Sequence, residues 1–386
     1  MYRDRTVGVV VPAYEEEGFV GDVIDTVPAF VDRVYPVDDR STDGTWAEIR
    51  EHAAAANAAW PEAASAPERT PFARRVVPIR REENGGVGAA IKTGYRRALV
   101  DEIDVIAVMN GDGQMDPDEL PRLLDPIVDG TADYAKGNRL VHADHRQGMS
   151  RWRLLGNTIL SGLTKVASGY WQLTDPQNGY TAVSAGALRR IDLDSVYDDY
   201  GFCNHLLVRL NAVDATVVDV AMPAVYGDER STIRYSRFIP SLSALLFRSF
   251  LWRLKTQYVV FGFHPLVALY LLGILGTGAG LAFVGAALGG ALGGAALRWL
   301  TLGGVGVLVL FLAALSLIAA VLLDMGQNDG LERRRYGRVG RDSVADGPPR
   351  PAPADDDPGA AAGTEADGPP MGIDEESTRT TPGSSS

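Results

Sequence analysis

Cysteine is almost absent from this 386-residue chain, and lysine is scarce. Cys203 is the one cysteine, so the chain can form neither an internal disulfide nor a cysteine-based metal site. Of the 37 basic residues only four are lysines, and 49 acidic residues bring the net charge to −12. This balance lacks the basic surface of nucleic-acid-binding proteins, so we expect no nucleic-acid partner. Residues 1–5 lead directly into a β-branched run, so we also expect no secretory signal.

Short apolar runs alternate with longer amphipathic stretches through the first 220 residues. This alternation predicts an α/β sheet of the doubly wound or a related type. The expected strands cover residues 6–11, 31–37, 75–79, 105–109, 133–136, 181–184 and 216–220. The expected helices cover residues 15–27, 41 to about 59, 87–99, 149–168 and 201–213, with a surface loop over 60–72.

The stretch Val105–Asp118, VIAVMNGDGQMDPD, begins as a buried strand and then turns polar. Its alternate positions carry oxygen-bearing side chains, so Asn110, Asp112 and Gln114 can point at one hard cation. Mg²⁺ and Mn²⁺ combine few carboxylates with substrate phosphates, which suits a metal–diphosphate site here. The alternative is an ordinary strand-to-helix turn that uses Asp and Gly for its backbone geometry. This stretch alone does not decide between the two.

Polar residues follow three of the expected strands. Pro12–Glu17 comes after the first strand, Asp38 and Asp39 after the second, and residues 110–114 after the fourth. The carboxyl ends of parallel strands share one edge of the sheet, where ligands bind. There a carboxylate can accept a hydrogen bond from a base or a ribose hydroxyl, and Tyr14 can stack on a base. The convergence favours a ligand site over three unrelated turns.

Two long uncharged runs, residues 266–288 and 300–323, are each long enough to span a bilayer. They follow an amphipathic stretch, residues 238–261, of the kind that lies at a membrane surface. Basic residues flank the pair on both outer sides, which by the positive-inside rule puts both flanks in the cytoplasm. The alternative is a buried helical hairpin in a soluble protein. From about residue 340 the composition is typical of disorder.

The motifs VPAYEEE, VDDRSTDGT, GDGQMDPDEL, GNR and DPQNGY together resemble those of the inverting family 2 glycosyltransferases, which have the GT-A fold. The closer resemblance is to the dolichyl- or polyprenyl-phosphate sugar synthase branch, similar to dolichol-phosphate mannose synthase. It extends over residues 5–235. Each motif alone is weak, and their combination in this order is specific.

The resemblance implies a role for each matching residue. The positions that hold the nucleotide sugar are Pro12, Tyr14, Glu16, Val37, Asp39 and Asp112. The positions that hold Mg²⁺ or Mn²⁺ are Asn110, Asp112 and Gln114. The acceptor phosphate is held by Arg139 and Arg153, with Asn157 nearby. The turn that lines the sugar and acceptor pocket contains Asp175, Gln177 and Asn178. The residues implied in catalysis are Arg139, Arg153, Asp175 and Gln177.

Three positions depart from the family pattern. Asn110 stands where an aspartate is usual, which removes one charge from the metal site. Glu15 replaces the usual asparagine of the first motif, and Arg40 replaces the usual glycine after the aspartate pair. These departures leave the nucleotide and the sugar open.

The acceptor determines which catalytic groups are needed. A lipid phosphate is already an anion, so it needs orientation by arginines more than a strong base. A hydroxyl acceptor needs a carboxylate base, for which Asp175 is the candidate. The simpler interpretation of Asp175 is a plain Asp-Pro turn.

We therefore predict an α/β GT-A domain over residues 1–235, an amphipathic interfacial segment over 236–262 and a transmembrane hairpin over 263–325. Residues 326–386 form a basic flank and a disordered acidic tail. The predicted enzyme is a multi-pass membrane protein with its catalytic domain and C-terminus in the cytoplasm. It transfers a hexose, with inversion, from a UDP- or GDP-sugar to dolichyl or polyprenyl phosphate for glycan assembly. The alternatives are a glycolipid or glycan hydroxyl acceptor, and a non-catalytic membrane scaffold with a degenerate nucleotide-sugar fold.

Overall fold

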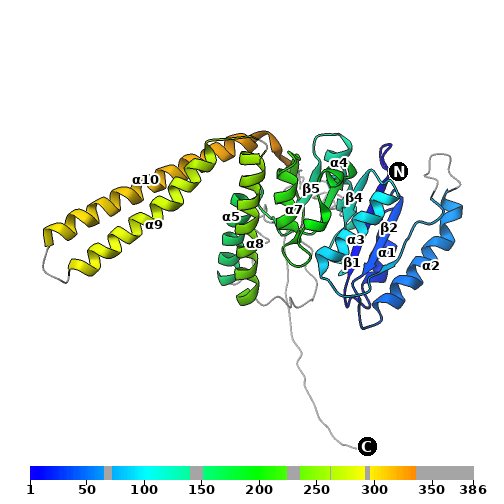
Figure 1. Ribbon diagram of the computed structural model, residues 1–386. Coiled ribbons are helices and arrows are strands. Elements are labelled where there is room, and N and C mark those ends of the chain that lie inside the picture. The colour runs from blue at the N-terminus through cyan, green and yellow to red at the C-terminus, as the bar shows by residue number, and fades with distance from the viewer. Residues whose placement is uncertain (65–71, 140–150, 224–234, 261, 292–295, 336–386) are drawn as a thin grey trace, which may run out of the picture. The chain divides into compact units, whose positions relative to one another are not determined.

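A mixed sheet of mostly β-branched strands forms the centre of the protein. In the computed structural model, which describes residues 1–64, 72–139, 151–223, 235–260, 262–291 and 296–335, the sheet has eight strands in the order β3-β2-β1-β4-β6-β5-β7-β8 (Figure 1). The strands are β1 (Val7–Ala13), β2 (Arg33–Asp38), β3 (Ile79–Arg80), β4 (Val105–Val108), β5 (Tyr134–Asn138), β6 (Thr181–Ser184), β7 (Val217–Ala221) and β8 (Glu332–Arg335).

Strand direction determines where the strand ends meet. β1 pairs in parallel with β2 and with β4, and β2 pairs in parallel with β3. β6 is antiparallel to both β4 and β5, while β5, β7 and β8 pair in parallel. All described strands except β6 therefore run in one direction, and their carboxyl ends face the same edge of the sheet.

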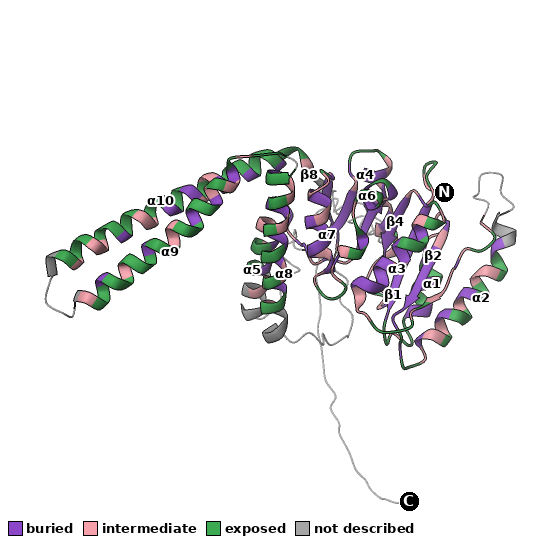
Figure 2. Cartoon of the chain, in the orientation of Figure 1, coloured by how far each residue is buried: buried purple, intermediate pink, exposed green. Residues whose placement is uncertain are grey.

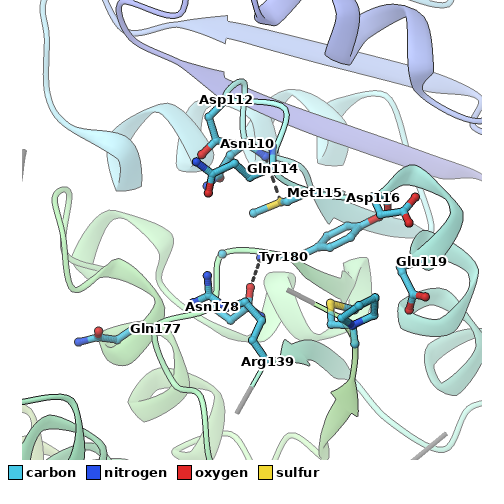
Figure 3. Close-up of a pocket in the computed structure, with 13 residues that line it drawn as sticks. Asn110, Asp112, Gln114, Met115, Asp116, Glu119, Arg139, Gln177, Asn178 and Tyr180 are labelled. Carbon is cyan, nitrogen blue, oxygen red and sulfur yellow. Dashed lines mark hydrogen bonds between the residues drawn. The ribbon is translucent and has the colours of Figure 1, made fainter. Parts of the chain in front are cut away.

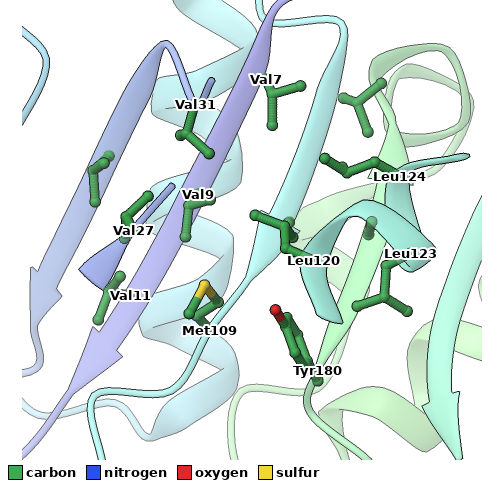
Figure 4. Packing of buried hydrophobic residues seen from close by; sticks show 14 of the residues in the cluster. Val7, Val9, Val11, Val27, Val31, Met109, Leu120, Leu123, Leu124 and Tyr180 are labelled. Atoms are coloured by element: carbon green, nitrogen blue, oxygen red, sulfur yellow. The ribbon is translucent and has the colours of Figure 1, made fainter. Parts of the chain in front are cut away.

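Helices cover both faces of the sheet. They are α1 (Val20–Thr26), α2 (Thr45–Ala64), α3 (Val87–Val100), α4 (Leu120–Val128), α5 (Arg151–Ser168), α6 (Ala185–Arg190), α7 (Phe202–Asn211), α8 (Tyr235–Lys255), α9 (Leu266–Ala291) and α10 (Ala296–Asn328). Val7, Val9 and Val11 of β1 pack with Leu120 and other residues of α1, α2 and α4 on one face (Figure 4). Val10 points to the other face, towards α3 and α7. This alternation is the expected period of a strand buried on both sides.

Most predicted elements are confirmed, with a few shifted limits. α1 starts at Val20 rather than residue 15, because the chain first turns, with Glu15 at a φ of 56°. α2 continues to Ala64, and buried Trp60 lies in a segment that was expected to be a loop. β3 is only two residues long, preceded by a single bridge between Val34 and Val76.

α9 and α10 lie side by side as an antiparallel hairpin (Figure 1). Added Cβ atoms would lie 2.5 Å from Leu317 at Gly273 and 2.7 Å from Leu310 at Gly280, so these glycines allow the close approach. Both helices are long and apolar enough to cross a membrane, by length and composition. Many of their side chains are exposed, in contrast to the buried strands (Figure 2).

A buried ion pair joins the end of the hairpin to the helices beside the sheet. Arg253 of α8 donates to both carboxylate oxygens of Asp324 in α10, at 3.0 and 2.8 Å, and both side chains are fully buried. Arg253 also donates to the carbonyl oxygens of Val166 and Ala167 in α5. The hydroxyl of Tyr258 donates to the same Asp324 carboxylate. Three helices thus meet at one side chain.

β8 is the main surprise of the fold. The sequence predicts a basic flank and a disordered tail over residues 326–386, but α10 continues to Asn328 and Glu332–Arg335 is a strand. Glu332 lies opposite Val217, so the chain returns from the hairpin to extend the sheet next to β7. Residues 336–386, which contain the predicted disordered tail, lie outside the described residues.

Candidate active site

The three polar clusters that the sequence analysis identified lie together at the sheet edge. Pro12 of β1 lies opposite Val37 of β2 in the strand register, and Asp39 is the first residue after β2. The backbone N–H of Asp39 donates to Ala13 at 2.9 Å. On the other side of β1, the N–H of Gly111 donates to the carbonyl oxygen of Pro12 at 3.1 Å. The end of β1 therefore connects the two other clusters.

Asp39 is held at the N-terminus of α3. Its carboxylate accepts the N–H groups of Gly86, at 2.7 Å, and Gly85, at 3.2 Å, and it forms an ion pair with Arg81. Gly86 has a φ of 91°, and an added Cβ would lie 2.9 Å from the carbonyl oxygen of Asp198. Only glycine fits this position without strain. The Gly85–Gly86 turn thus orients the carboxylate expected to meet the nucleotide.

Tyr14 and Glu16 occupy the turn after β1. Tyr14 is 44% exposed, so its ring is accessible for stacking on a base. The neighbouring Glu15 carboxylate raises the pKa of Tyr14. The backbone N–H of Glu16 donates to Thr45 at 2.8 Å, and its carbonyl accepts the N–H of Val20. Glu16 thereby shapes the turn that leads into α1.

Two of the departures from the family pattern coincide with unusual backbone conformations. Glu15 has a φ of 56° and Arg40 a φ of 67°, both in the left-handed region. The residues usual at these positions, asparagine and glycine, are the ones that adopt this region at least cost. The positive φ at Glu15 and Arg40 is therefore a conformation that asparagine and glycine would adopt with less strain.

A cavity of about 190 Å³ lies beside these strand ends (Figure 3). Asn110, Asp112 and Gln114, all from the loop after β4, line one side of it. One oxygen of Asp112 accepts the N–H of Gln114 at 3.0 Å. The N–H of Asn110 points to the sulfur of Met115 at 3.2 Å. These short contacts give the loop its fold and bring the three predicted metal ligands into one cavity.

The donor set in this loop is compatible with a hard divalent cation that also binds phosphates. It supplies one carboxylate and two amide side chains, and two more acidic residues, Asp116 and Glu119, line the same cavity. Mg²⁺ and Mn²⁺ bind in this way, with substrate oxygens completing the coordination. Among the described residues there is no group of three or more His, Cys, Asp and Glu side chains arranged to hold a metal.

Arg139 and Asp175 form an ion pair at the opposite side of the cavity. The Nε of Arg139 donates to Asp175 Oδ2 at 3.1 Å, and the backbone N–H of Arg139 donates to the same oxygen at 3.3 Å. Asp175 is buried, whereas Arg139 is 47% exposed and lines the cavity. The aspartate therefore orients the arginine, which also lines the cavity.

Two amides of the 175–180 turn have unused hydrogen-bonding groups. Among the described residues, Gln177 Nε2 and Asn178 Nδ2 are buried without a hydrogen-bond partner, and both side chains line the cavity. Asn178 uses its oxygen to accept the N–H of Tyr180 at 3.0 Å (Figure 3). A buried amide donor without a partner is costly, so these groups are suited to bind an oxygen-rich ligand.

A second ion pair joins β5 and β7, the strands that lead to the cavity residues Arg139 and Met222. Lys136 Nζ lies 3.0 Å from Asp219 Oδ1, and both side chains are only 1% exposed. Asp219 also accepts the backbone N–H and the hydroxyl of Thr174, at 3.3 and 2.9 Å. The pair links β5, β7 and the turn that carries Asp175. The sequence analysis missed it, because no motif marks either residue.

Other predicted residues are placed only in part. Arg153 and Asn157 lie in α5, but their side chains are outside the described part of the chain. The cavity is also lined by residues that the sequence did not single out, among them Met115, Tyr180 and Met222. The hydroxyl of Tyr180 donates to the carbonyl oxygen of Asp116 at 2.9 Å. Tyr180 is the last residue of the DPQNGY motif, so this motif is a signal by which the sequence could have predicted Tyr180 as a site residue. Met222 gives no such signal, since nothing marks an apolar residue after a strand.

Comparison with known proteins gives the following relatives. The model of "Glycosyl transferase family 2" matches residues 8–192. The undecaprenyl-phosphate mannosyltransferase of Micrococcus luteus is 31% identical over 223 residues, which cover 56% of this chain and 82% of the relative. The UDP-N-acetylglucosamine–dolichyl-phosphate N-acetylglucosaminyltransferase of Methanococcus voltae is 26% identical over 226 residues, 58% of this chain and 88% of the relative. Among solved structures, glucosyl-3-phosphoglycerate synthase of Mycobacterium tuberculosis aligns with 20% identity and a TM-score of 0.44, covering 65% of this chain and 80% of that one.

Proposed function

Because the chain belongs to glycosyl transferase family 2, with the GT-A fold, we propose that it transfers a hexose from a nucleotide sugar to a polyprenyl or dolichyl phosphate. That it is a glycosyltransferase follows from the family. The acceptor class is supported by relatives that are named for sugar transfer to undecaprenyl and dolichyl phosphate. The observation that carries the proposal is the cavity. Asn110, Asp112 and Gln114, which suit a metal-bound diphosphate, line one side of it, and Arg139 lines the other.

We assign the nucleotide to the edge formed by the ends of β1 and β2. Tyr14 stacks on the base and Asp39 accepts hydrogen bonds from the base or ribose, whereas the side chains of Pro12 and Val37 are buried in the sheet below and contribute only the backbone of the strand ends. The Asp39 carboxylate accepts hydrogen bonds from the backbone N–H groups of Gly85 and Gly86. These hydrogen bonds support this role, because they orient the carboxylate before the nucleotide binds. The donor is a UDP- or GDP-hexose.

We assign the diphosphate to the loop after β4. Asn110, Asp112 and Gln114 would hold Mg²⁺ or Mn²⁺ together with the phosphate oxygens. A cation bound there supplies positive charge that stabilises the nucleoside diphosphate as it leaves. Replacement of the usual aspartate by Asn110 leaves Asp112 as the charged ligand among the three.

We assign the acceptor phosphate to the opposite side of the cavity, where Arg139 orients it. A phosphate oxygen of the acceptor attacks the anomeric carbon and forms the new C–O bond. The bond from that carbon to the donor phosphate breaks on the opposite face, with inversion, and its electron pair leaves with the nucleoside diphosphate. The acceptor is already an anion, so no proton has to be removed.

This assignment makes Asp175 a positioning residue for Arg139. One of its oxygens already accepts two N–H groups of Arg139, which supports an orienting role over that of a general base. Gln177 and Asn178 would donate their buried amide protons to sugar or phosphate oxygens. Arg153 and Asn157 are proposed to complete the acceptor site from α5.

We also propose that α9 and α10 anchor the enzyme in a membrane as two crossings, with α8 at its surface. The pairing of β8 with β7 supports an even number of crossings, because the chain must return to the side that it left. Arginines at positions 333–335 follow the hairpin, so the positive-inside rule puts both flanks in the cytoplasm. We keep the proposed limits for the catalytic domain, 1–235, the interfacial segment, 236–262, the hairpin, 263–325, and the C-terminal region, 326–386. Within the C-terminal region, β8 belongs to the sheet of the catalytic domain.

Membranes that contain the protein test the function directly. They are incubated with labelled UDP- and GDP-hexoses, Mn²⁺ and polyprenyl phosphate, and then extracted with organic solvent. We expect label in a lipid that mild acid hydrolyses, and this labelling should be about 10²-fold slower with the Asp112→Asn variant. Label in acid-resistant glycolipid would support a hydroxyl acceptor instead. Absence of label from every donor, with folded protein, would support the non-catalytic scaffold.

A further inference from the structure

Glu332, the first residue of β8, makes an unusual contact with the segment before the active-site turn. Its carboxylate is buried and accepts the backbone N–H of Trp171, and it accepts the N–H of Gln172 at 2.6 Å. Two consecutive backbone donors thus share one carboxylate. The contact joins residues 160 positions apart in the sequence.

The residues after this contact lead directly into the cavity. Thr174 is hydrogen-bonded to Asp219 of β7, Asp175 orients Arg139, and Gln177 and Asn178 are among the residues that line the cavity. The segment is therefore held from two neighbouring strands, β8 at its start and β7 at Thr174. The Glu332 contact is the one that holds the two backbone N–H groups at the start of this segment.

We infer that Glu332 is a positioning residue of the active site: it holds the backbone at Trp171 and Gln172 so that the 175–178 turn keeps its place in the cavity. The holding group comes from the segment that follows the membrane hairpin. The effect of Glu332 on turnover rests on the proposed function, whereas its effect on the backbone does not.

The chemistry of the contact explains why a carboxylate is suited to it. An ionised carboxylate is an acceptor only, so both of its oxygens can take an N–H group. A glutamine would direct its NH₂ group at one of the two donors and lose that bond. The neighbouring Arg333 is exposed and lies in the same strand, which makes it a matched control.

Hydrogen exchange measured by mass spectrometry tests the contact on the full-length protein in lipid nanodiscs. We compare wild type with Glu332→Gln, Glu332→Asp and Arg333→Ala. We expect the amides of residues 171–172 to exchange on the order of 10-fold faster in Glu332→Gln, since hydrogen bonds to charged groups are among the stronger ones. The Arg333→Ala variant should match wild type. Unchanged exchange of β1 and α3 peptides would show that each variant is folded.

Turnover gives the second readout, with the donor and acceptor that label the lipid product. In Glu332→Gln we expect kcat to fall by about 10-fold or the KM for polyprenyl phosphate to rise similarly, while the KM for the nucleotide sugar stays within about twofold. Glu332→Asp should recover part of the loss, because it restores the charge. A merely structural strand would lower both substrate affinities together or none.

The two readouts separate the inference from the proposed function. If the wild type transfers no sugar but Glu332→Gln speeds exchange at residues 171–172, the proposed function fails and the backbone contact stands. If the wild type is active and exchange at these amides is the same in Glu332→Gln, the inference is overturned. Equal loss of turnover in Arg333→Ala and Glu332→Gln would overturn it as well.

Discussion

The buried pair of Arg253 and Asp324 allows a quantitative prediction about the junction between the hairpin and the sheet. Asp324→Asn keeps the size of the side chain and removes its charge, which leaves the guanidinium buried without a counter-charge. Arg253 still reaches the carbonyl oxygens of Val166 and Ala167, but these are neutral acceptors. Breaking a buried ion pair in this way costs about 3–5 kcal/mol.

The expected loss can be measured as a shift in thermal unfolding. For domains of this size about 1 kcal/mol corresponds to 2–4 °C, so Asp324→Asn should lower the melting temperature by about 6 °C or more in detergent or nanodiscs. Arg248→Met, on the exposed side of the same helix, is the control and should change the melting temperature by less than about 2 °C.

A double variant distinguishes the pair from two independent residues. In the double variant Arg253→Met with Asp324→Leu, neither charge remains. Its loss of unfolding free energy should be smaller, by at least about 1 kcal/mol, than the summed losses of the single variants Arg253→Met and Asp324→Leu. Strictly additive single effects would refute the reasoning, because they would mean that the two charges do not depend on each other. A single variant that melts like wild type would refute it equally.

Four further predictions concern the site and the membrane. Asp112→Asn should lower turnover by about 10²-fold in assays at saturating Mn²⁺, because the charged ligand is lost, and normal turnover would mean that the cation binds elsewhere. Arg139→Lys should lower turnover by about 10²-fold with the donor affinity unchanged, since lysine does not reproduce the planar, bidentate contact; loss of donor affinity instead would assign the arginine to the diphosphate. Arg40→Gly should raise the free energy of unfolding by about 1 kcal/mol in denaturant titrations, because glycine relieves the positive φ, and a destabilised variant would contradict this. A tag after Ser386 should be cut by protease added to inverted vesicles and protected in intact cells, and the opposite pattern would exclude a cytoplasmic C-terminus.

Local patterns in the sequence predict the strand ends, the helices and the apolar hairpin. Val7, Val9 and Val11 alternate with the period of a strand, and the clusters at Pro12, Asp39 and Asn110 stand where neighbouring parallel strands end. Each of these patterns depends on residues that are close together in the sequence. The alternation of a strand and the residue types of a turn can therefore be recognised before the fold is known.

The contacts that the sequence does not reveal join distant residues. Arg253 and Asp324 are separated by 71 positions, Lys136 and Asp219 by 83, and Trp171 and Glu332 by 161. No local pattern shows which charged residues form a pair in the fold. A short arginine-rich stretch such as β8 has the composition of a solvent-exposed segment, so its composition does not predict a strand. The antiparallel direction of β6 is likewise decided by pairing rather than by its own four residues.

The position of β8 makes the catalytic domain discontinuous in sequence. During synthesis the first 221 residues emerge before α9 and α10, and β8 is made only after both. Until then β7 has an unpaired edge, and unpaired edges are prone to pair with other chains. Completion of the sheet therefore waits until both helices of the hairpin have been made. A truncated protein that stops before the hairpin would also lack β8 and retain an open sheet edge at β7.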